Sequence, residues 1–320
     1  MRISFNSPID PLNIEKTNGY GYATDRMLTS LENLGHEVTH NDPHAEVGFC
    51  FNQPQHWKFY GDQYRIGYHP WESTLLKDGW AEIMNECDEI WTPSPLIASW
   101  YKEYAGVTVP VYVYEHGVDD VWSPVKRTVD DKFHFLHVGA EASRKGAREV
   151  MGGFRRAFPK NKGEVQLNMK IISNGWQIGN IRNINILNTR LSLTELVQLY
   201  HDNHAFVYPS WGEGFGLTPL QAMATGMPTI TVPAWAPYAP FLDQTLNIGS
   251  SFANTPWPQL HPGFMLKPNE DDVIDRMRWV YDNYDACVGV AMNKVDGLKE
   301  WYNWDRLTKV AFDNLEQRRK

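Results

Sequence analysis

Short apolar runs alternate with stretches of helical period along the first part of the chain. The run RISFNS precedes a predicted helix from Thr24 to Leu34, and Gly35 ends that helix. The apolar face of the helix consists of Met27, Leu28, Leu31 and Leu34. HEVTH follows as the next predicted strand. This order of strand, helix and strand is typical of a parallel sheet.

The same order returns in the segment EIMNECDEIWTPSPLIASWYKEYAG. It predicts the end of a helix, a strand, and a second helix that begins with Ser94 as N-cap and Pro95 in its first turn. The run VPVYVYEHG predicts a further strand. Residues 119–132, DDVWSPVKRTVDDK, carry charges and a proline instead, so we interpret them as a linker.

The alternation starts again at residue 133. Ser192 and Glu195 fit a capping box at the start of a helix, and helical patterns continue from Asp271 to Gln317. The predicted strands are 133–139, 165–173, 184–188, 205–210 and 228–232. One predicted helix covers 146–158, a second begins at Ser192 and a third begins at Thr218.

We therefore predict an α/β protein of two Rossmann-like, doubly wound domains, because strands alternating with helices form parallel sheets covered on both faces. Ligands bind beyond the carboxyl ends of such strands, so two such edges facing a central cleft would form the site. A length of 320 residues also favours two domains. We place an N-terminal acceptor domain at 1–125, a C-terminal donor domain at 126–300 and a C-terminal helix at 301–320.

The formal net charge of -8 disfavours a protein that coats nucleic acid through general electrostatics. Residues 144–162 are locally basic, and we interpret most of them as a solvated helix face. No apolar run approaches the roughly 20 residues of a membrane span, and the N-terminus lacks the apolar core of a signal peptide. We expect a soluble, cytoplasmic protein without a membrane span.

The segment WGEGFGLTPLQAM places a carboxylate, three glycines and a predicted helix start within one short run. We expect Thr218 to cap a helix that begins at Pro219, with Gln221 completing a capping box. The glycines let the backbone approach a ligand, and the helix N-terminus favours an anion such as a diphosphate. Glu213 would be repelled by phosphate, so it suits a hydroxyl-rich group next to the phosphate.

The longer segment YPSWGEGFGLTPLQAMATGMPTITV resembles the donor-site segment of the retaining GT-B glycosyltransferases, the group that includes glycogen synthase and many bacterial mannosyl- and glucosyltransferases (glycosyl transferases group 1, family four). Four other segments match that family in order across nearly the whole chain: NGYGYA, DEIWTPS, EHGVDDVWSP and SRKGAREVMGGFRRAF. The resemblance implies the GT-B fold, in which the last helix crosses back to the N-terminal domain.

The resemblance also implies roles for individual residues. Lys145 would bind the diphosphate and stabilise the leaving nucleotide, Glu213 would hold the donor sugar by its hydroxyls, and His116 would contact the sugar near the reacting carbon. Gly19 and Gly21 would form a loop that closes over the diphosphate. Each of these residues also has a purely structural interpretation. Lys145 would then be a solvated lysine at a helix start, His116 a histidine at the end of a strand, and Gly19 and Gly21 ordinary turn glycines. The other donor-binding positions are Arg144, Gly214, Phe215, Gly216, Leu217, Thr218 and Gln221.

Two positions depart from the family pattern. Gln221 stands where many relatives carry a second Glu that accepts hydrogen bonds from ribose. Ala140 stands where relatives often carry an Arg, so one phosphate contact is either missing or supplied by Arg144. No D-x-D motif occurs, which argues against a nucleotide held through a divalent metal. The resemblance implies metal-independent transfer with retained configuration, in which the leaving phosphate accepts the proton. The co-substrate is a UDP- or GDP-sugar, with no cofactor.

The predicted activity is transfer of a hexose-type sugar to a hydroxyl acceptor, which is a glycan, a small molecule or a polymer. His69, Trp71 and Glu72 are the candidate acceptor-binding residues, in a stretch rich in aromatic and polar side chains. One alternative is a phage-type enzyme that glycosylates a hydroxylated DNA base. Alternatives of other classes are a non-catalytic nucleotide-sugar-binding protein, a nucleotide-sugar epimerase and a phosphorylase.

Overall fold

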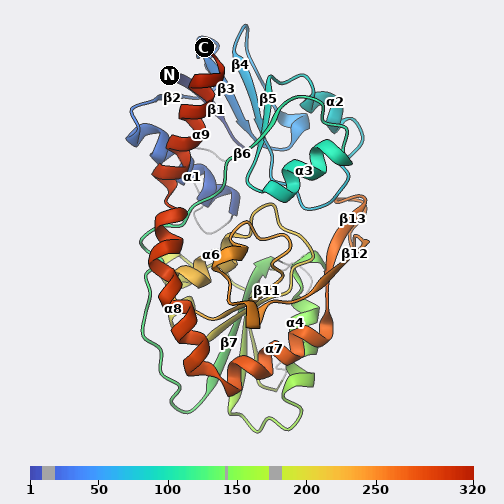
Figure 1. Cartoon of the computed structure of the whole chain (residues 1–320), viewed down its shortest axis with the longest axis vertical. Coiled ribbons are helices and arrows are strands. Elements are labelled where there is room, and N and C mark those ends of the chain that lie inside the picture. Colours follow the sequence, from blue (N-terminus) through green and yellow to red (C-terminus); the bar gives the residue numbers. More distant parts are fainter. Residues whose placement is uncertain (9–18, 141–142, 173–181) are drawn as a thin grey trace. The chain divides into compact units, whose positions relative to one another are not determined.

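The computed structural model describes residues 1–8, 19–140, 143–172 and 182–320 (Figure 1). The chain divides into two compact units, each assembled from separate stretches of sequence. Unit 1 consists of Met1–Gly117, Pro258–Phe264 and Trp301–Lys320, and unit 2 consists of Val118–Trp257 and Met265–Glu300. Parallel sheets with helices in both units confirm the predicted α/β class.

Unit 1 contains a six-stranded sheet in the order β2-β1-β3-β4-β5-β6, in which all neighbouring strands are parallel. The strands are β1 (Arg2–Asn6), β2 (Glu37–Thr39), β3 (Val47–Phe51), β4 (Tyr64–Tyr68), β5 (Glu89–Thr92) and β6 (Val111–Val113). The helices are α1 (Gly19–Asn33), α2 (Trp80–Met84), α3 (Pro95–Glu103) and α9 (Trp304–Arg318). The last helix, α9, lies against α1, as the GT-B fold implies.

Unit 2 contains a five-stranded parallel sheet in the order β11-β10-β7-β8-β9. Its strands are β7 (Phe133–Ala140), β8 (Val165–Ile172), β9 (Ile184–Leu187), β10 (Ala205–Tyr208) and β11 (Thr229–Thr231). β12 (Ser250–Asn254) and β13 (Phe264–Pro268) form a separate two-stranded sheet. The α-helices of unit 2 are α4 (Ala147–Ala157), α5 (Leu193–His201), α6 (Leu217–Ala224), α7 (Glu270–Asp282) and α8 (Tyr284–Trp301), of which α8 follows α7 directly.

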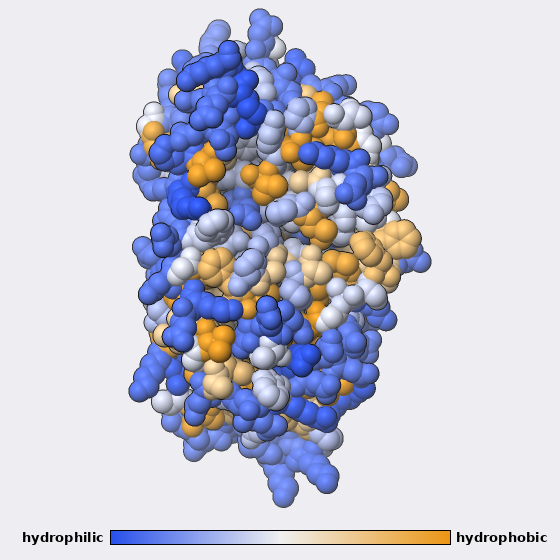
Figure 2. Space-filling view, in the orientation of Figure 1, coloured by the Kyte–Doolittle hydropathy of each residue, from blue (hydrophilic) through white to orange (hydrophobic). Residues whose placement is uncertain are grey.

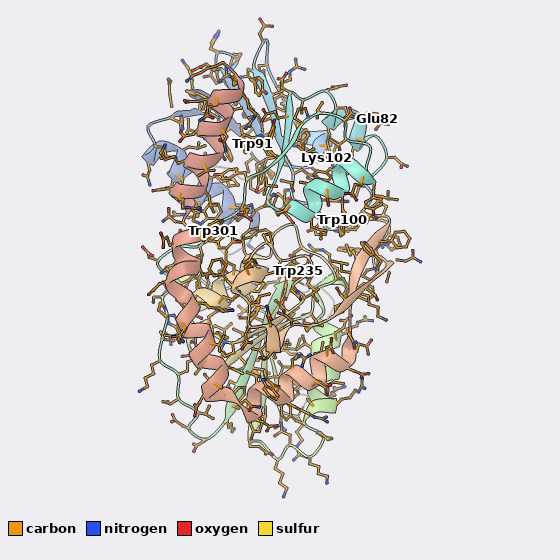
Figure 3. All side chains as sticks on the ribbon, viewed as in Figure 1. Glu82, Trp91, Trp100, Lys102, Trp235 and Trp301 are labelled. Carbon is orange, nitrogen blue, oxygen red and sulfur yellow. The ribbon has the colours of Figure 1, made fainter. Side chains whose placement is uncertain are left out.

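Large aromatic side chains fill the interior of each unit. Trp91 in unit 1 and Trp235 in unit 2 are almost completely buried, whereas Trp301 is half exposed (Figure 3). The face of the molecule in Figure 2 is mostly hydrophilic, with scattered apolar side chains. Many of the tryptophans therefore serve packing, which is their ordinary role in a protein of this kind.

The local signals at several helix boundaries are confirmed. Ser192 and Glu195 form the predicted capping box at the start of α5, with both reciprocal bonds present. Ser94 is the N-cap residue of α3 and Pro95 is the first residue of the helix, although the Ser94 side chain makes no capping hydrogen bond. Ile172 ends β8, and Ser173 of the predicted strand lies outside the described residues.

The predicted loop around Gly19 and Gly21 is wrong, because α1 begins at Gly19 and Gly21 lies buried in its first turn. Two glycines separated by one residue lower helix propensity, so this spacing favoured a loop. Burial of the side chains in the first turns of α1, including Tyr22 and Ala23, outweighs that local preference.

The strands β3 and β4 have no counterpart in the sequence prediction. Each is only five residues long and each contains a glycine, Gly48 and Gly67, which weakens the strand signal. Packing explains Gly67: a Cβ atom there would overlap the ring of Trp57. The glycine lets the tryptophan lie directly on the sheet, and the sequence pattern does not reveal that contact.

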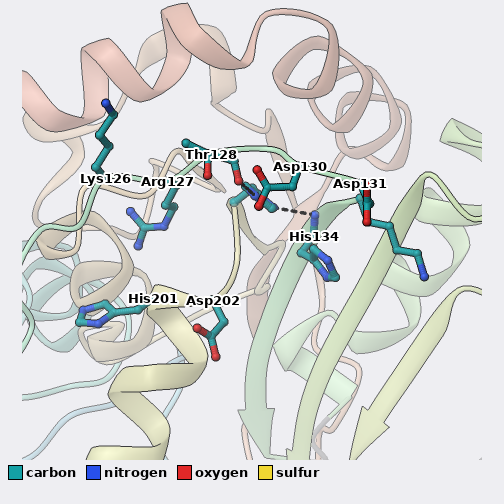
Figure 4. A pocket seen from close by; sticks show the side chains of 10 residues that line it. Lys126, Arg127, Thr128, Asp130, Asp131, His134, His201 and Asp202 are labelled. Carbon is teal, nitrogen blue, oxygen red and sulfur yellow. Dashed lines mark hydrogen bonds between the residues drawn. The ribbon is translucent and has the colours of Figure 1, made fainter.

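Residues 119–132 contain no helix or strand, as expected of a linker, but they are firmly attached to unit 2. Trp122 is fully buried, and its ring meets that of Tyr200 at 5.0 Å. Arg127 (Figure 4) uses all five of its N–H groups as donors. The acceptors are the carbonyls of Val125, Tyr200, Asn203 and Thr225 and the hydroxyl of Thr225.

Candidate active site

The unit 2 sheet has a point at which the direction of strand addition reverses. From β7 the chain adds β8 and β9 on one side, then crosses to place β10 and β11 on the other. Ligands of open α/β sheets bind at such a switch point, outside the carboxyl ends of the strands. Here the segment after β7 contains Arg144 and Lys145, and the segment after β10 contains Ser210 and Glu213.

Glu213 is the centre of this edge, and its carboxylate is almost fully buried. The Lys145 ammonium donates to both carboxylate oxygens, at 2.7 Å to Oε1 and 2.6 Å to Oε2. The Arg144 guanidinium donates to Oε1 at 2.9 Å, and Ser210 Oγ and Tyr208 OH also donate to Oε1, at 2.7 and 3.0 Å. Among the described residues, Oε2 accepts only from Lys145, so this oxygen retains capacity for a further donor.

The electrostatics of the cluster keep Glu213 ionised. Burial alone would raise the pKa of Glu213, but the nearby charges of Lys145 and Arg144 outweigh that effect and hold it at about 2. Two cations therefore face one carboxylate, and the three groups together carry one net positive charge. A partly buried cluster of that charge attracts an anion.

Backbone contacts bring the two segments of the site together. The N–H of Trp211 donates to the carbonyl of Arg144 at 2.8 Å, and the Arg144 side chain donates to the carbonyl of Gly212 at 2.9 Å. Gly146 has a φ of +77°, and a Cβ atom there would overlap Pro209. A glycine is required at this position because the turn after Lys145 lies directly against the turn after β10.

The helix start in this segment differs from the prediction. Gly216, with a φ of +88°, is the N-cap residue of α6, and the helix begins at Leu217. The predicted capping box of Thr218 and Gln221 is therefore wrong. A Cβ atom on Gly216 would lie 2.5 Å from Tyr238 OH and 2.6 Å from the Trp235 ring, so the packing of these two side chains requires a glycine at this position.

The remaining donor-binding positions surround this helix start. Gly214 and Phe215 are buried, Leu217 and Thr218 are half-buried, and Gln221 is buried within α6. The N-terminal amides of α6 belong to the turn that carries Glu213, and such amides suit a phosphate or a sugar hydroxyl. Ala140 is exposed at the last position of β7, where it supplies no cation.

Three functional candidates that the sequence reasoning did not single out lie in the same cluster. Tyr208 and Ser210 donate to Glu213 as described above, and both are in the segment that carries the family resemblance. His137 on β7 stacks on Tyr208 at 5.5 Å and bonds the carbonyl of Val207 at 2.9 Å. Burial lowers the pKa of His137 to about 4, so the ring is neutral and supports the cluster without adding charge.

His116 belongs to unit 1 and lies just after β6. It is buried, with ring centroids at 5.6 Å from Trp304, 5.9 Å from Tyr68 and 6.3 Å from Phe51. Burial lowers its pKa to about 3, so the imidazole is neutral at ordinary pH. Its predicted contact with the donor sugar stays a prediction.

The three predicted acceptor residues follow β4 in unit 1, but two of them are packed inside it. His69 is 1% exposed and stacks on Trp71 at 5.3 Å, and Trp71 is 4% exposed. Tyr101 OH lies 2.7 Å from His69 Nδ1, and burial lowers the pKa of His69 to about 3. Glu72 pairs with His261 at 3.3 Å. An acceptor role for these residues stays a prediction.

Unit 2 also has an open cavity of about 570 Å³ at the opposite edge of its sheet (Figure 4). It is lined by residues at the amino ends of strands, among them His134 near the start of β7 and His204 just before β10. Arg127 in this lining has no donor left for a ligand. Ligands of such sheets bind at the carboxyl ends of the strands, whereas this cavity lies at the amino ends. Its position and the fully used donors of Arg127 both disfavour this cavity as the active site.

Comparisons with known proteins find one matching family model and many solved structures of similar fold. Residues 111–240 match the family model described as Glycosyl transferases group 1, which includes the segments of Lys145 and Glu213. Comparison with curated protein sequences gives no match.

Solved structures show the same fold at low sequence identity. Sucrose-phosphate synthase from Thermosynechococcus elongatus is similar with a TM-score of 0.74 and 12% identity, over 99% of each chain. WaaG, a glycosyltransferase involved in lipopolysaccharide biosynthesis, has a TM-score of 0.66 and 12% identity, over 97% of this chain and 98% of its own. A UDP-forming α,α-trehalose-phosphate synthase from Burkholderia vietnamiensis has a TM-score of 0.64 and 10% identity, over 94% of this chain and 80% of its own. The predicted GT-B fold is confirmed.

None of the described helices has the length and apolar character needed to cross a membrane. Within the described ranges, no group of three or more His, Cys, Asp or Glu residues could hold a metal ion. Metal independence stays a prediction.

Proposed function

We propose that this chain, in which residues 111–240 match the family model described as Glycosyl transferases group 1, is a glycosyltransferase that moves a hexose-type sugar from a nucleoside diphosphate sugar to a hydroxyl acceptor, with retention and without a metal ion. The observation that carries this proposal is the contact of Lys145 and Arg144 with Glu213 at the switch point of the unit 2 sheet. It combines a diphosphate-binding charge with a sugar-binding carboxylate.

Lys145 supplies the charge that a metal ion provides in other transferases. When the bond between the anomeric carbon and the phosphate oxygen breaks, negative charge grows on the departing diphosphate, and a cation placed there lowers the barrier. The acceptor oxygen forms its bond to the anomeric carbon on the same face, and its proton passes to the leaving phosphate oxygen. The step is balanced without a separate general base.

Glu213 holds the sugar in this scheme. Its Oε1 is saturated by four donors, whereas Oε2 keeps capacity for a hydroxyl donor. With a pKa of about 2, the carboxylate is an acceptor throughout the neutral range and does not act as an acid. We therefore assign it to orienting the sugar hydroxyls, which places the anomeric carbon for attack.

A UDP-sugar is the first donor to test, because one structural neighbour is named as UDP-forming. A GDP-sugar is the second. Gln221 accepts hydrogen bonds at its amide oxygen but has no charge, so we expect it to bind ribose less strongly than a glutamate would.

One second candidate has a specific observation in its favour. Gln221 and the exposed Ala140 are the two departures from the family pattern, and they favour a protein that binds a nucleotide sugar without turning it over. Release of free nucleotide in the presence of any acceptor excludes that candidate. No feature of the described residues favours a hydroxylated DNA base as acceptor.

The test uses the purified chain with UDP-, GDP- and dTDP-hexoses, a panel of hydroxyl acceptors and detection of released nucleotide. We expect Lys145→Met and Glu213→Gln each to lower turnover by about 100-fold or more. The control is Lys299→Met, which breaks another lysine–carboxylate pair of unit 2, with Asp120 at 3.0 Å, and should change turnover less than about twofold. NMR of the product anomeric centre tests retention, and turnover in EDTA tests metal independence.

Normal rates in both site variants, with circular dichroism showing intact folding, would contradict the assigned site. An inverted product would overturn retention alone.

A further inference from the structure

The turn that carries Glu213 is held at both ends by two aromatic side chains of the segment after β11. Trp235 Nε1 donates to the carbonyl of Ser210 at 2.9 Å, near the start of the turn. Tyr238 OH donates to the carbonyl of Gly216 at 2.7 Å, where the turn ends and α6 begins. Both aromatic side chains are fully buried. The turn is therefore fixed from behind by two separate hydrogen bonds.

The segment that carries these two aromatic side chains is itself anchored to unit 2. Ile248, at its end, donates its N–H to the carbonyl of Thr231 in β11 at 2.9 Å, which closes the segment on itself. Thr231 Oγ1 donates to the carbonyl of Tyr208 in β10 at 2.8 Å. Lys294 Nζ of α8 donates to the carbonyl of Leu242 at 2.7 Å. These contacts make the segment a fixed frame, so a bond from it can hold the turn in one geometry.

Trp235 acts at the end of the turn that determines where the carboxylate lies. Ser210, whose carbonyl accepts from Trp235, donates its hydroxyl to Glu213 Oε1 at 2.7 Å. The Trp235 ring also packs edge-on against Tyr208 at 6.3 Å, and Tyr208 OH is a second donor to the same oxygen, at 3.0 Å. Two hydroxyl donors to the carboxylate therefore depend on the position of one indole ring.

Tyr238 acts at the other end, where the amides of α6 begin. The carbonyl of Gly216 accepts the first helical bond, from the N–H of Leu220, at 3.4 Å, which is long for a hydrogen bond. The bond from Tyr238 to the same carbonyl is 2.7 Å long, so it is the stronger of the two. The Tyr238 ring also packs edge-on against Phe215 at 5.7 Å. The orientation of the first peptide group of α6 therefore depends on Tyr238.

We propose that Trp235 and Tyr238 are positioning residues that control the two parts of donor recognition separately. Trp235, acting through Ser210, sets the carboxylate that orients the sugar, and Tyr238, acting through Gly216, sets the first amides of α6 for the diphosphate. Both side chains are buried behind the turn and act through its backbone. The inference rests on the proposed function and assigns residues outside the turn to the specificity of the same site.

The test compares two ligands that differ by the sugar. Isothermal calorimetry measures UDP against UDP-glucose and GDP against GDP-mannose. We expect Tyr238→Phe to weaken the nucleoside diphosphate and the nucleotide sugar alike, by about fivefold, the loss of one hydrogen bond. Trp235→Phe should weaken the nucleotide sugar by about fivefold and leave the nucleoside diphosphate within about twofold. The control is Tyr284→Phe, since Tyr284 is a buried tyrosine of unit 2 whose hydroxyl has no hydrogen-bond partner among the described residues.

A double-mutant cycle separates positioning from a general loss of packing. Ser210→Ala should reproduce the pattern of Trp235→Phe, because it removes the hydroxyl through which Trp235 acts on Glu213. Trp235→Phe should then weaken the nucleotide sugar by less than about twofold when it is added to Ser210→Ala. Fully additive losses would overturn the role of Trp235. Urea unfolding monitors the fold, and if Trp235→Phe does not fold, Ser210→Ala and Tyr238→Phe still give the two contrasting patterns.

Turnover assays distinguish this inference from the proposed function. The contrasting binding patterns, without turnover of any nucleotide sugar by the parent chain, support the positioning roles and contradict the proposed function. Turnover by the parent chain, with both variants weakening both ligands equally or neither ligand at all, overturns the positioning roles alone. Absence of nucleotide binding by the parent chain overturns both.

Discussion

Arg318 in the last helix donates two hydrogen bonds to the carboxylate of Glu89 on β5, at 2.7 and 2.8 Å. Glu89 is buried, and it also accepts from Trp91 Nε1 at 2.7 Å and from Tyr64 OH at 2.9 Å. Burial alone would raise the pKa of Glu89, but the bonds from Arg318, Trp91 and Tyr64 lower it. The pair fastens the end of α9 to the sheet of unit 1.

Removal of one partner from this pair should destabilise the protein. We expect Arg318→Met to lower the free energy of unfolding by about 3 kcal/mol, because it leaves a buried carboxylate without its cation. Lys309→Met on the same helix is the control, since Lys309 forms an exposed pair with Asp313 and should cost less than about 0.5 kcal/mol. Urea unfolding of both variants measures the difference. Equal losses of unfolding free energy in the two variants would show that the Arg318–Glu89 pair contributes no more than an exposed surface pair.

The ionisation of Glu213 predicts an acid-sensitive site. Its pKa is about 2 in the folded protein and near 4.5 ordinarily, so the ionised carboxylate stabilises the fold above about pH 4.5 and this contribution is lost as the pH falls toward 2. The difference corresponds to about 3 kcal/mol.

Urea unfolding of the parent chain and of Glu213→Gln between pH 3 and pH 7 tests this dependence. The parent should lose more stability toward low pH than the variant does, because the amide does not titrate. Parallel curves for the two proteins would mean that the carboxylate is not held by Lys145 and Arg144 in solution.

Two glycines offer a matched test of packing. Gly67→Ala should destabilise the protein by about 1–3 kcal/mol, because the added methyl group overlaps the ring of Trp57. Gly152→Ala should stabilise it by about 0.5–1 kcal/mol, since Gly152 is an exposed position in α4 with nothing within 4 Å of the new Cβ atom. Thermal unfolding of the two variants measures whether each substitution lowers or raises the stability. A neutral Gly67→Ala would show that Trp57 does not lie against β4.

Comparison of prediction and structure shows what local chemistry decides. The capping box of Ser192 and Glu195 was predictable because both residues are within one helical turn. The turn that carries Glu213 was recognisable because its glycines, its helix and its carboxylate are consecutive in the chain. The two-sheet α/β architecture followed from alternating periodicities, which are also a property of short stretches.

The sequence by itself thus determined the fold class, most of the strand and helix order outside β3 and β4, and the segment that holds the candidate site. Only the tertiary structure decided which residues meet there. Arg144 reaches Glu213 across 69 positions and Arg318 reaches Glu89 across 229. Packing in the folded unit also places Trp57 on Gly67 and buries the first turns of α1 from Gly21 on. Such contacts depend on how strands are ordered in the sheets, and no periodicity in a short window carries that information.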